Sequence, residues 1–390
     1  MIEQWRNDTP GIEQRIHFNN AGAALPPQVV IDVQQAYLQE EALLGGYEMA
    51  AASLGNIQGT YHSLARLLHT SSEHIALSTN ATVAYNKALG SIPFEKGDYI
   101  LTTYNDYVSN HIAFMQLQKM YGTQTEMVPN GSDGCVDVEA MEKAIKKRAP
   151  KLVAVTHIPT SSGLIQDVES IGELCAKYDV LYLIDACQSA GQLDLDVNKI
   201  KCDFMSATGR KFLRGPRGTG FLYVSQKVLD RGFEPHFLDL HSAEWLAADQ
   251  YKGVSTAKRF EIWERNYGLV LGLKAAVDYA LHVGLDTIRQ RVQVLAQHLR
   301  ISLKDIPGIK VLDPPNHLSG ILTCHVEGWN ASDFQKMLFE HKINSSIVYK
   351  EGARLDLGAN NIDWASRLSV HYYNTIEEID TLKALLSNRL

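Results

Sequence analysis

Short apolar runs alternate with amphipathic stretches between about residues 60 and 225. Strands are predicted for the apolar runs at residues 98–104, 151–158, 180–186, 202–209 and 218–224. Helices are predicted where apolar side chains recur at helical spacing, at residues 81–92, 109–122, 138–149 and 169–179. Strands that alternate with helices indicate crossover connections and a mostly parallel sheet.

The pattern changes after about residue 270. A long helical stretch over residues 266–306 leads to short apolar runs and two shorter helical segments. These predict a small α/β domain of two or three strands under helices. We therefore expect three parts: an N-terminal arm over residues 1–20, a large domain over residues 21–275 and a small C-terminal domain over residues 276–390.

Composition narrows the class of protein. With 390 residues, the chain is long enough for two domains. The apolar runs are far shorter than a membrane span, and the polar start lacks the apolar centre of a signal peptide, so we expect a cytoplasmic protein without a membrane partner. A net charge of −7 without a basic block argues against a nucleic-acid partner. The five cysteines form no C-x-x-C pair, which favours reduced thiols and argues against a metal site.

Two of the predicted strands end in residues that can carry chemistry. Asp185 ends the apolar run "LYLID", and Gln188 follows three residues later. The segment "FMSATGRKF" places Thr208, Arg210 and Lys211 just past another strand. Ligands bind beyond the carboxyl ends of parallel strands, so these side chains should meet at one edge of the sheet. A lysine there can bind phosphate, act as a base or form a Schiff base, and a buried aspartate needs a positive partner or its pKa rises.

Pyridoxal phosphate uses this whole set of residue types. Its aldehyde takes an amine, its ring nitrogen an acid, its phosphate several hydrogen-bond donors and its ring face a flat group. Ala81 and Thr82 open a predicted helix and offer backbone amides to the phosphate, which Thr208 and Arg210 can complete. Tyr107 supplies a flat group. Each residue alone has an ordinary structural explanation, such as a helix cap or a solvated side chain, but their order along the chain favours the cofactor.

The motifs "IDACQSAG" and "SATGRKFLRGPRGTGFLYV" resemble those of the class V aminotransferase family of fold-type I pyridoxal-phosphate enzymes. The similarity extends from "FNNAGAALPP" to "SRLSVHYYNTIEEID". Within the family, "GGYEMAA" and "KRFEIWERN" resemble isopenicillin N epimerase and the C–S lyases of ergothioneine synthesis more than the cysteine desulfurases. The resemblance implies an α/β fold with a large domain, whose mostly parallel sheet is flanked by helices, and a small C-terminal α/β domain. It also implies a homodimer with shared active sites.

The resemblance further assigns roles to single residues. Lys211 forms the Schiff base with the cofactor and moves the Cα proton, Asp185 pairs with the ring nitrogen, and Gln188 bonds the ring hydroxyl. The positions implied to hold the cofactor are Ala81, Thr82, Tyr107, Thr160, Asp185, Gln188, Thr208, Arg210 and Lys211. The positions implied to contact an amino-acid substrate are Asn20, Ala21, Asn110 and Arg367, the last of which binds its α-carboxylate.

Two sequence differences from the desulfurases determine which activity we expect. Desulfurases usually carry a histidine where this chain has Tyr107, and a catalytic cysteine on the loop before Arg367, whereas residues 344–367 contain no cysteine. We therefore expect a C–S β-lyase that acts through an external aldimine and a quinonoid and forms pyruvate and ammonia from a cysteine conjugate or sulfoxide. An amino-acid epimerase or an aminotransferase is the alternative. A cysteine desulfurase, a selenocysteine lyase and a catalytically silent binding protein rank behind these.

Overall fold

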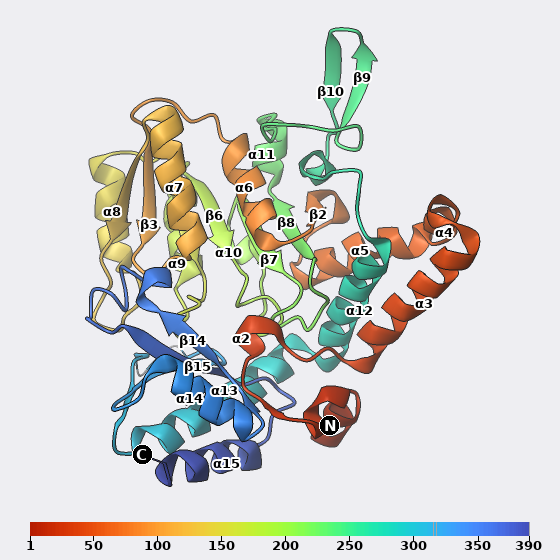
Figure 1. Cartoon of the computed structure of the whole chain (residues 1–390). Helices are drawn as coiled ribbons and strands as arrows, with labels where there is room; N and C mark the ends of the chain where they lie inside the picture. Colours follow the sequence, from red (N-terminus) through yellow and green to blue (C-terminus); the bar gives the residue numbers. More distant parts are fainter. Residues whose placement is uncertain (315, 317, 390) are drawn as a thin grey trace.

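The computed structural model describes residues 1–314, 316 and 318–389. A seven-stranded sheet runs through its centre in the order β2-β8-β7-β6-β5-β3-β4 (Figure 1). Its strands are β2 (Ile75–Ser78), β3 (Tyr99–Thr103), β4 (Gln124–Val128), β5 (Leu152–Thr156), β6 (Leu181–Asp185), β7 (Phe204–Thr208) and β8 (Gly220–Val224). β8 is antiparallel to both of its neighbours, and the other neighbouring pairs are parallel. The prediction of a mostly parallel sheet is therefore confirmed.

The strands predicted from apolar runs occupy the middle of this sheet, and the two that the pattern missed are its edges. β2 has only four residues, and β4 alternates exposed with half-buried side chains, so neither forms a long apolar run. Central strands of a parallel sheet are buried on both faces and are apolar throughout. The pattern therefore reveals the strands that carry the site and misses the edges.

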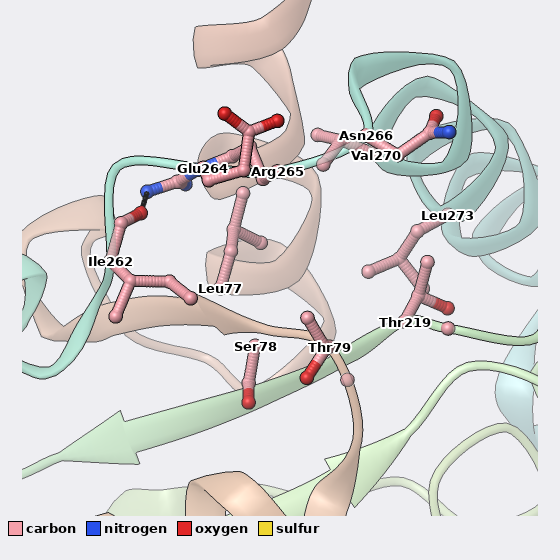
Figure 2. A pocket seen from close by; sticks show the side chains of 12 residues that line it. Leu77, Ser78, Thr79, Thr219, Ile262, Glu264, Arg265, Asn266, Val270 and Leu273 are labelled. Carbon is pink, nitrogen blue, oxygen red and sulfur yellow. Dashed lines mark hydrogen bonds between the residues drawn. The ribbon is translucent and has the colours of Figure 1, made fainter.

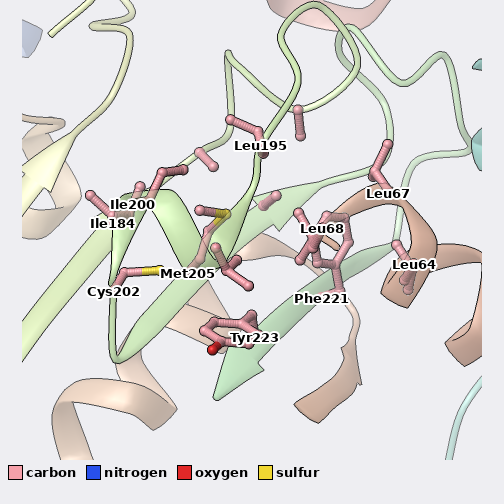
Figure 3. Close-up of a cluster of buried hydrophobic side chains, with 14 of the residues drawn as sticks. Leu64, Leu67, Leu68, Ile184, Leu195, Ile200, Cys202, Met205, Phe221 and Tyr223 are labelled. Atoms are coloured by element: carbon pink, nitrogen blue, oxygen red, sulfur yellow. The ribbon is translucent and has the colours of Figure 1, made fainter. Parts of the chain in front are cut away.

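Helices cover both faces of the sheet. One face carries α5 (Leu54–Leu67), α8 (Val138–Lys147), α9 (Val168–Lys177), α10 (Val197–Ile200) and α12 (Tyr267–Val283). The other carries α6 (Ala81–Ser91), α7 (Val108–Tyr121) and α11 (Gln226–Asp230). Alternate strand residues point to opposite faces, and Met205 and Phe221 pack in one buried cluster with Leu64 of α5 (Figure 3). Burial of apolar surface, which contributes about 25 cal/mol per Å², fixes the strands whose ends form the site.

The C-terminal part is built on a second sheet of four antiparallel strands, in the order β11-β12-β15-β14. Its elements are α13 (Leu285–Lys304), β11 (Ile309–Val311), β12 (Ile321–Val326), α14 (Ala331–Glu340), β13 (Ile343–Asn344), β14 (Ser346–Tyr349), β15 (Trp364–Ser369) and α15 (Ile376–Ser387). The prediction of two or three strands was too low because β11 has only three residues. Helices α13, α14 and α15 pack against the buried face of this sheet.

The chain turns sharply between the two parts. Helices α12 and α13 are bent by 79° at Gly284, whose φ of +89° suits a residue without a side chain. The boundary expected between residues 275 and 276 falls inside α12, so the domain division stays a prediction. In the N-terminal arm, β1 (Ile16–His17) pairs with β13, which ties the arm to the C-terminal part.

A two-stranded hairpin projects from the large domain at the top of Figure 1. It consists of β9 (Ala243–Ala247) and β10 (Gln250–Gly253), while the N-terminal part contributes the helices α3 (Gln28–Leu44) and α4 (Gly46–Ala52) elsewhere on the molecule. None of residues 236–253, which include this hairpin, lines the cavity around Lys211. Within the described part of the chain, no single helix is long and apolar enough to cross a membrane, and only the bent pair α12–α13 meets that test jointly.

Candidate active site

A cavity of about 480 Å³, called here the cofactor cavity, opens at the carboxyl ends of β5, β6 and β7 and at the start of α6. Its lining includes every position that the sequence analysis assigned to the cofactor: Ala81, Thr82, Tyr107, Thr160, Asp185, Gln188, Thr208, Arg210 and Lys211. It also includes Asn80, Val83, Thr156, Ile158, Cys187 and Gly218, which that analysis did not assign. The structure therefore brings the expected cofactor residues together, while their individual roles stay predictions.

Asp185 is held in place at the end of β6. Its Oδ1 accepts a hydrogen bond from the backbone N–H of Cys187 at 2.9 Å, and its Oδ2 accepts one from Asn110 Nδ2 at 3.4 Å. The side chain is buried but lines the cavity. A carboxylate fixed in this way can form an ion pair with a protonated ring nitrogen.

Lys211 follows β7 and points its amine into the same cavity. The residue is 9% exposed, and burial lowers the pKa of its amine below the ordinary value. Its amine makes no hydrogen bond within the described part of the chain. A buried amine with a lowered pKa has a larger neutral fraction, and the neutral form is the one that attacks an aldehyde.

The start of α6 forms a cradle for an anion. Asn80 caps this helix by accepting a hydrogen bond from the N–H of Val83 at 2.9 Å, which leaves the N–H groups of Ala81 and Thr82 for a ligand. The cradle depends on Gly220 of β8. A Cβ there would lie 2.9 Å from the nitrogen of Ala81, so a larger residue would push the helix start away. Sequence reasoning missed Gly220, because its importance depends on a contact across the sheet.

Gln188 and Arg367 meet at Thr160. Gln188 Nε2 donates to Thr160 Oγ1 at 3.2 Å, and Arg367 donates to the same oxygen at 2.7 Å and to the Thr160 carbonyl at 3.1 Å. The Oε1 atom of Gln188 and the Nε atom of Arg367 are buried without a partner among the described residues. A buried polar atom without a partner is costly, so both atoms fit a site completed by a ligand.

The cavity region holds an excess of buried positive charge. Arg210, Lys211 and Arg367 form no ion pair with any carboxylate that the structure describes, although Asp185 lies close enough to favour the charged form of Lys211. Burial lowers the pKa of the Arg367 guanidinium to about 10. Arg210 donates only to the carbonyl of Gly22. Three cations without paired acids fit the two anions that a phosphate cofactor and an amino-acid carboxylate would bring.

Tyr107 is positioned by a buried acid that the sequence analysis did not identify. The N–H of Tyr107 donates to Asp106 Oδ1 at 2.7 Å, and Asn110 Nδ2 donates to the same oxygen at 2.9 Å. Thr102 and Thr156 also donate to this carboxylate. Asn110 therefore lies between two carboxylates, and it is not among the residues that line the cavity.

Asn20 and Ala21 join the N-terminal arm to β15. Asn20 Nδ2 donates to the Ser369 carbonyl at 2.6 Å, and the N–H of Ala21 donates to Ser369 Oγ at 2.8 Å. The Ala21 carbonyl accepts a hydrogen bond from Gln188. Neither residue lines the cofactor cavity, so their expected contact with the substrate stays a prediction.

A cavity of only about 40 Å³ has Gly218 in its lining, as the cofactor cavity does. Figure 2 shows its other walls, which include Leu77, Thr219 and Leu273. Ile262 and Glu264 border it, and Arg265 donates to the Ile262 carbonyl at 2.7 Å. Arg265 also pairs with the fully buried side chain of Glu261 at 2.8 Å. The segment around residues 259–266 is thus anchored by buried charges and leaves Ile262 and Glu264 exposed.

The whole chain is similar to known pyridoxal-phosphate enzymes. It is 29% identical over 389 residues to a protein of Methanothermobacter thermautotrophicus named "Probable cysteine desulfurase", with 97% of this chain and 96% of that protein covered. The apo structure of a cysteine desulfurase from Thermococcus onnurineus NA1 superimposes with a TM-score of 0.92 at 26% identity, over 99% of this chain and 97% of that one. The cystine C–S lyase C-DES, in complex with cysteine persulfide, shares the fold with a TM-score of 0.87 at 22% identity, over 97% of this chain and 99% of that one.

Residues 16–382 match the sequence model of the family described as aminotransferase class-V. The match covers the cofactor cavity, the helix start that forms its anion cradle and the second sheet that carries Arg367. The expected fold class and cofactor are confirmed by the family and by the solved structures. This protein is a pyridoxal-phosphate-dependent member of the aminotransferase class-V family.

Proposed function

We propose that the protein cleaves the C–S bond of a cysteine-type L-amino acid by β-elimination. The relatives named cysteine desulfurase support a sulfur-containing amino acid as the substrate class. When bound, pyridoxal phosphate withdraws electrons from the substrate Cα. In such an elimination Lys211 would take the Cα proton, the Cβ–S electron pair would leave on sulfur as a thiolate that takes up a proton to become the thiol, and water would hydrolyse the remaining 2-aminoacrylate to pyruvate and ammonia.

The residues of this chain would supply the positioning and the proton transfers. Arg367 can hold the substrate carboxylate with its planar fork, because its Nη1 is fixed on Thr160 and its Nε has no partner among the described residues. Lys211 can remove the Cα proton, since burial lowers the pKa of its amine toward the working range of a base. Asp185 would hold a proton on the ring nitrogen by its charge.

The positions and protonation of the cysteine thiols are our reason for choosing elimination over sulfur transfer. A desulfurase needs an exposed, activated thiolate that reaches the substrate sulfur. Residues 344–367 contain no cysteine. Cys187 alone lines the cofactor cavity, and burial raises the pKa of its thiol, which keeps it protonated. The remaining cysteines, Cys135, Cys175, Cys202 and Cys324, are buried, and burial raises the pKa of each thiol.

Cysteine desulfurase activity is the second candidate, and two observations favour it. The most similar relatives reported above carry that name. Cys187 also lies in the cofactor cavity and is half-buried rather than fully buried. Our expectation that a β-lyase ranks ahead of a desulfurase therefore depends on the thiols and not on the relatives.

Product analysis separates the two candidates. The holoenzyme is incubated with L-cysteine, L-cystine and S-methyl-L-cysteine, and pyruvate, ammonia and alanine are quantified. Elimination predicts equal amounts of pyruvate and ammonia, and the Cys187→Ala variant should keep this product ratio. Alanine in equal amount to a persulfide that is lost in Cys187→Ala, but kept in Cys135→Ala, would refute elimination and support the desulfurase. Racemised substrate or an amino-acceptor requirement would support the epimerase or the aminotransferase instead.

Assembly and location are also proposals. We infer a homodimer because exposed apolar side chains gather on the β9–β10 hairpin and on α3 and α4, where Trp245 and Leu43 are 79% and 80% exposed. Light scattering at micromolar concentration tests this, and a monomer would contradict it. A cytoplasmic location stays a prediction, which fractionation of the source cells tests.

A further inference from the structure

A second cavity of about 730 Å³, called here the outer cavity, lies between α7, β4 and residues 351–356 of the C-terminal part. Much of its lining is apolar and open to solvent, and Ile112 and Met115 of α7 are 48% and 53% exposed. Small-molecule sites usually measure roughly 300–1,000 Å³ and have mostly apolar walls. The outer cavity therefore has the size and lining of a binding site.

The two cavities share a wall. Tyr107 and Thr160 line the cofactor cavity, whereas their sequence neighbours Asp106 and Ser161 line the outer cavity. At residues 160 and 161 a single peptide unit therefore lies between the two spaces. The outer cavity is therefore a second volume directly beside the cofactor cavity, on the other side of this wall.

The C-terminal part holds this wall from both sides. Arg367 donates to Thr160 Oγ1 at 2.7 Å on the cofactor side, and Ser161 Oγ donates to Asp356 Oδ2 at 3.3 Å on the outer side. Arg367 is the residue proposed to hold the substrate carboxylate. An amino acid gripped there would lie beside the shared wall, and a long substituent on its sulfur would have to extend past the edge of that wall to enter the outer cavity.

The charges around the outer cavity select against an anion. The charged residues in its lining are Asp106, Glu351, Arg354 and Asp356. The Asp106 carboxylate is already enclosed by four donors, which leaves the carboxyl groups of Glu351 and Asp356 against the one guanidinium of Arg354. Anionic groups are disfavoured by this excess, whereas the exposed apolar surface of Ile112 and Met115 gains free energy when a neutral apolar group covers it.

We propose that the outer cavity binds the sulfur substituent of the substrate, and that the substrate class is an L-cysteine carrying a bulky, neutral, apolar or aromatic group on sulfur. This inference rests on the proposed C–S cleavage and deepens it. Cysteine itself leaves the outer cavity empty. A substituent the size of a benzyl group reaches past Thr160 and covers Met115.

The test compares three substrates of graded size and charge: S-methyl-L-cysteine, S-benzyl-L-cysteine and S-(4-carboxybenzyl)-L-cysteine. Pyruvate formation gives kcat/KM, and the change in cofactor absorbance on titration gives Kd. The variant Met115→Trp fills the outer cavity. Met120→Trp is the matched control, because Met120 lies on the same helix and is 60% exposed but does not line the cavity.

We expect the wild type to prefer the benzyl over the methyl substrate by about tenfold in kcat/KM, a factor that corresponds to about 1.4 kcal/mol. The carboxybenzyl substrate should lose most of that gain. Met115→Trp should abolish the preference and leave the methyl substrate within about twofold of wild type, while Met120→Trp should change neither. If Met115→Trp lowers the thermal midpoint, Ile112→Trp takes its place.

Equal kcat/KM for the methyl and benzyl substrates, or an equal loss for both in Met115→Trp, would overturn the outer cavity as a substituent site. A change of oligomeric state in Met115→Trp would overturn it as well, because a second copy would then cover this surface. If no substrate yields pyruvate, the proposed function fails. The Kd values still decide the binding site in that case, since equal Kd values for the two substrates would reject it.

Discussion

The cofactor cavity and the outer cavity are neighbours, yet they are built in different ways. The cofactor cavity is bordered by the ends of buried strands, and its charged side chains Asp185, Lys211 and Arg210 have few partners. The outer cavity is bordered by one helix, one edge strand and a loop, and Met115 and Ile112 face solvent there. The proposed roles separate chemistry from selection in the same way: the first cavity has groups that can bind anions and move protons, and the second has exposed apolar surface that can recognise a substituent by its shape.

The two cavities also differ in how firmly the residues that line them are held in place. Strand ends in the middle of a packed sheet are held by contacts on both faces, as is Asp185 at the end of β6. The loop over residues 351–356 is held by its own backbone hydrogen bonds, by the packing of Ala353 and by the contact between Asp356 and Ser161. We therefore expect changes in the cofactor cavity to alter turnover for every substrate, and changes in the outer cavity to alter preference among substrates.

Lys211→Ala should have the largest effect. We expect turnover to fall by at least about 10⁴-fold for every substrate, because the covalent link to the cofactor and the proton transfer are lost together. Borohydride reduction followed by peptide mapping should label Lys211 in the wild type. Lys199→Ala, on the exposed end of α10, serves as the control. A label on another lysine would reject the assignment.

Asp185→Asn should rank second, with a loss of about 10²–10⁴-fold in kcat. The amide keeps the shape of the side chain but removes the charge that would hold the ring proton. The cofactor should still bind, but the pH dependence of its absorbance should change. Asp196→Asn at the cap of α10 is a control outside the cavity. Near-normal activity in Asp185→Asn would contradict the role.

Arg367→Lys should weaken amino-acid binding by about 10–100-fold and leave the spectrum of the bound cofactor unchanged, because an ammonium cannot form the paired hydrogen bonds of a guanidinium. Burial lowers the pKa of Arg367 to about 10, so binding in the wild type should also weaken as pH rises through that value. Arg354→Lys in the outer cavity is the matched control, with S-methyl-L-cysteine as substrate. Equal Kd values for wild type and Arg367→Lys would rule out the carboxylate contact.

His157→Gln changes a buried residue that leads into the loop of Thr160, where the wall between the cavities lies, and should have the smallest effect. Burial lowers the pKa of His157 to about 4, whereas an unfolded histidine titrates near 6.5. The unfolded state therefore binds more protons between these values, so acid removes stability as pH falls from about 6.5 toward 4 and removes no more below that. Between pH 7 and pH 5 the loss is about 2 kcal/mol.

The glutamine variant should lose less stability than the wild type over that range. The thermal midpoints of both holoenzymes at pH 7, 6 and 5 measure the difference. Parallel pH profiles for the two proteins would show that His157 does not titrate on unfolding, and an intact kcat in the variant at pH 7 would show that the wall keeps its shape.

Much of the cofactor cavity could be predicted from the sequence. Asp185 and Lys211 follow strands that are apolar on both faces, and the carboxyl ends of parallel strands meet at one edge. The order of these residues along the chain therefore implied their convergence before any contact was known. The helix start at Ala81 could also be predicted from local sequence, because a cap residue and an apolar run mark it.

Other features depend on contacts between segments that are distant in the chain. Gly220 matters because the backbone of Ala81 lies against it, and Asp106 because four donors from three elements surround its carboxylate. The outer cavity exists only where α7 meets a loop more than two hundred residues later. The sequence alone determined which side chains stand at the ends of the central strands, since that follows from the local apolar pattern. The tertiary structure decided which buried polar atoms are left without a hydrogen-bond partner and where a second cavity opens, since both depend on packing across the molecule.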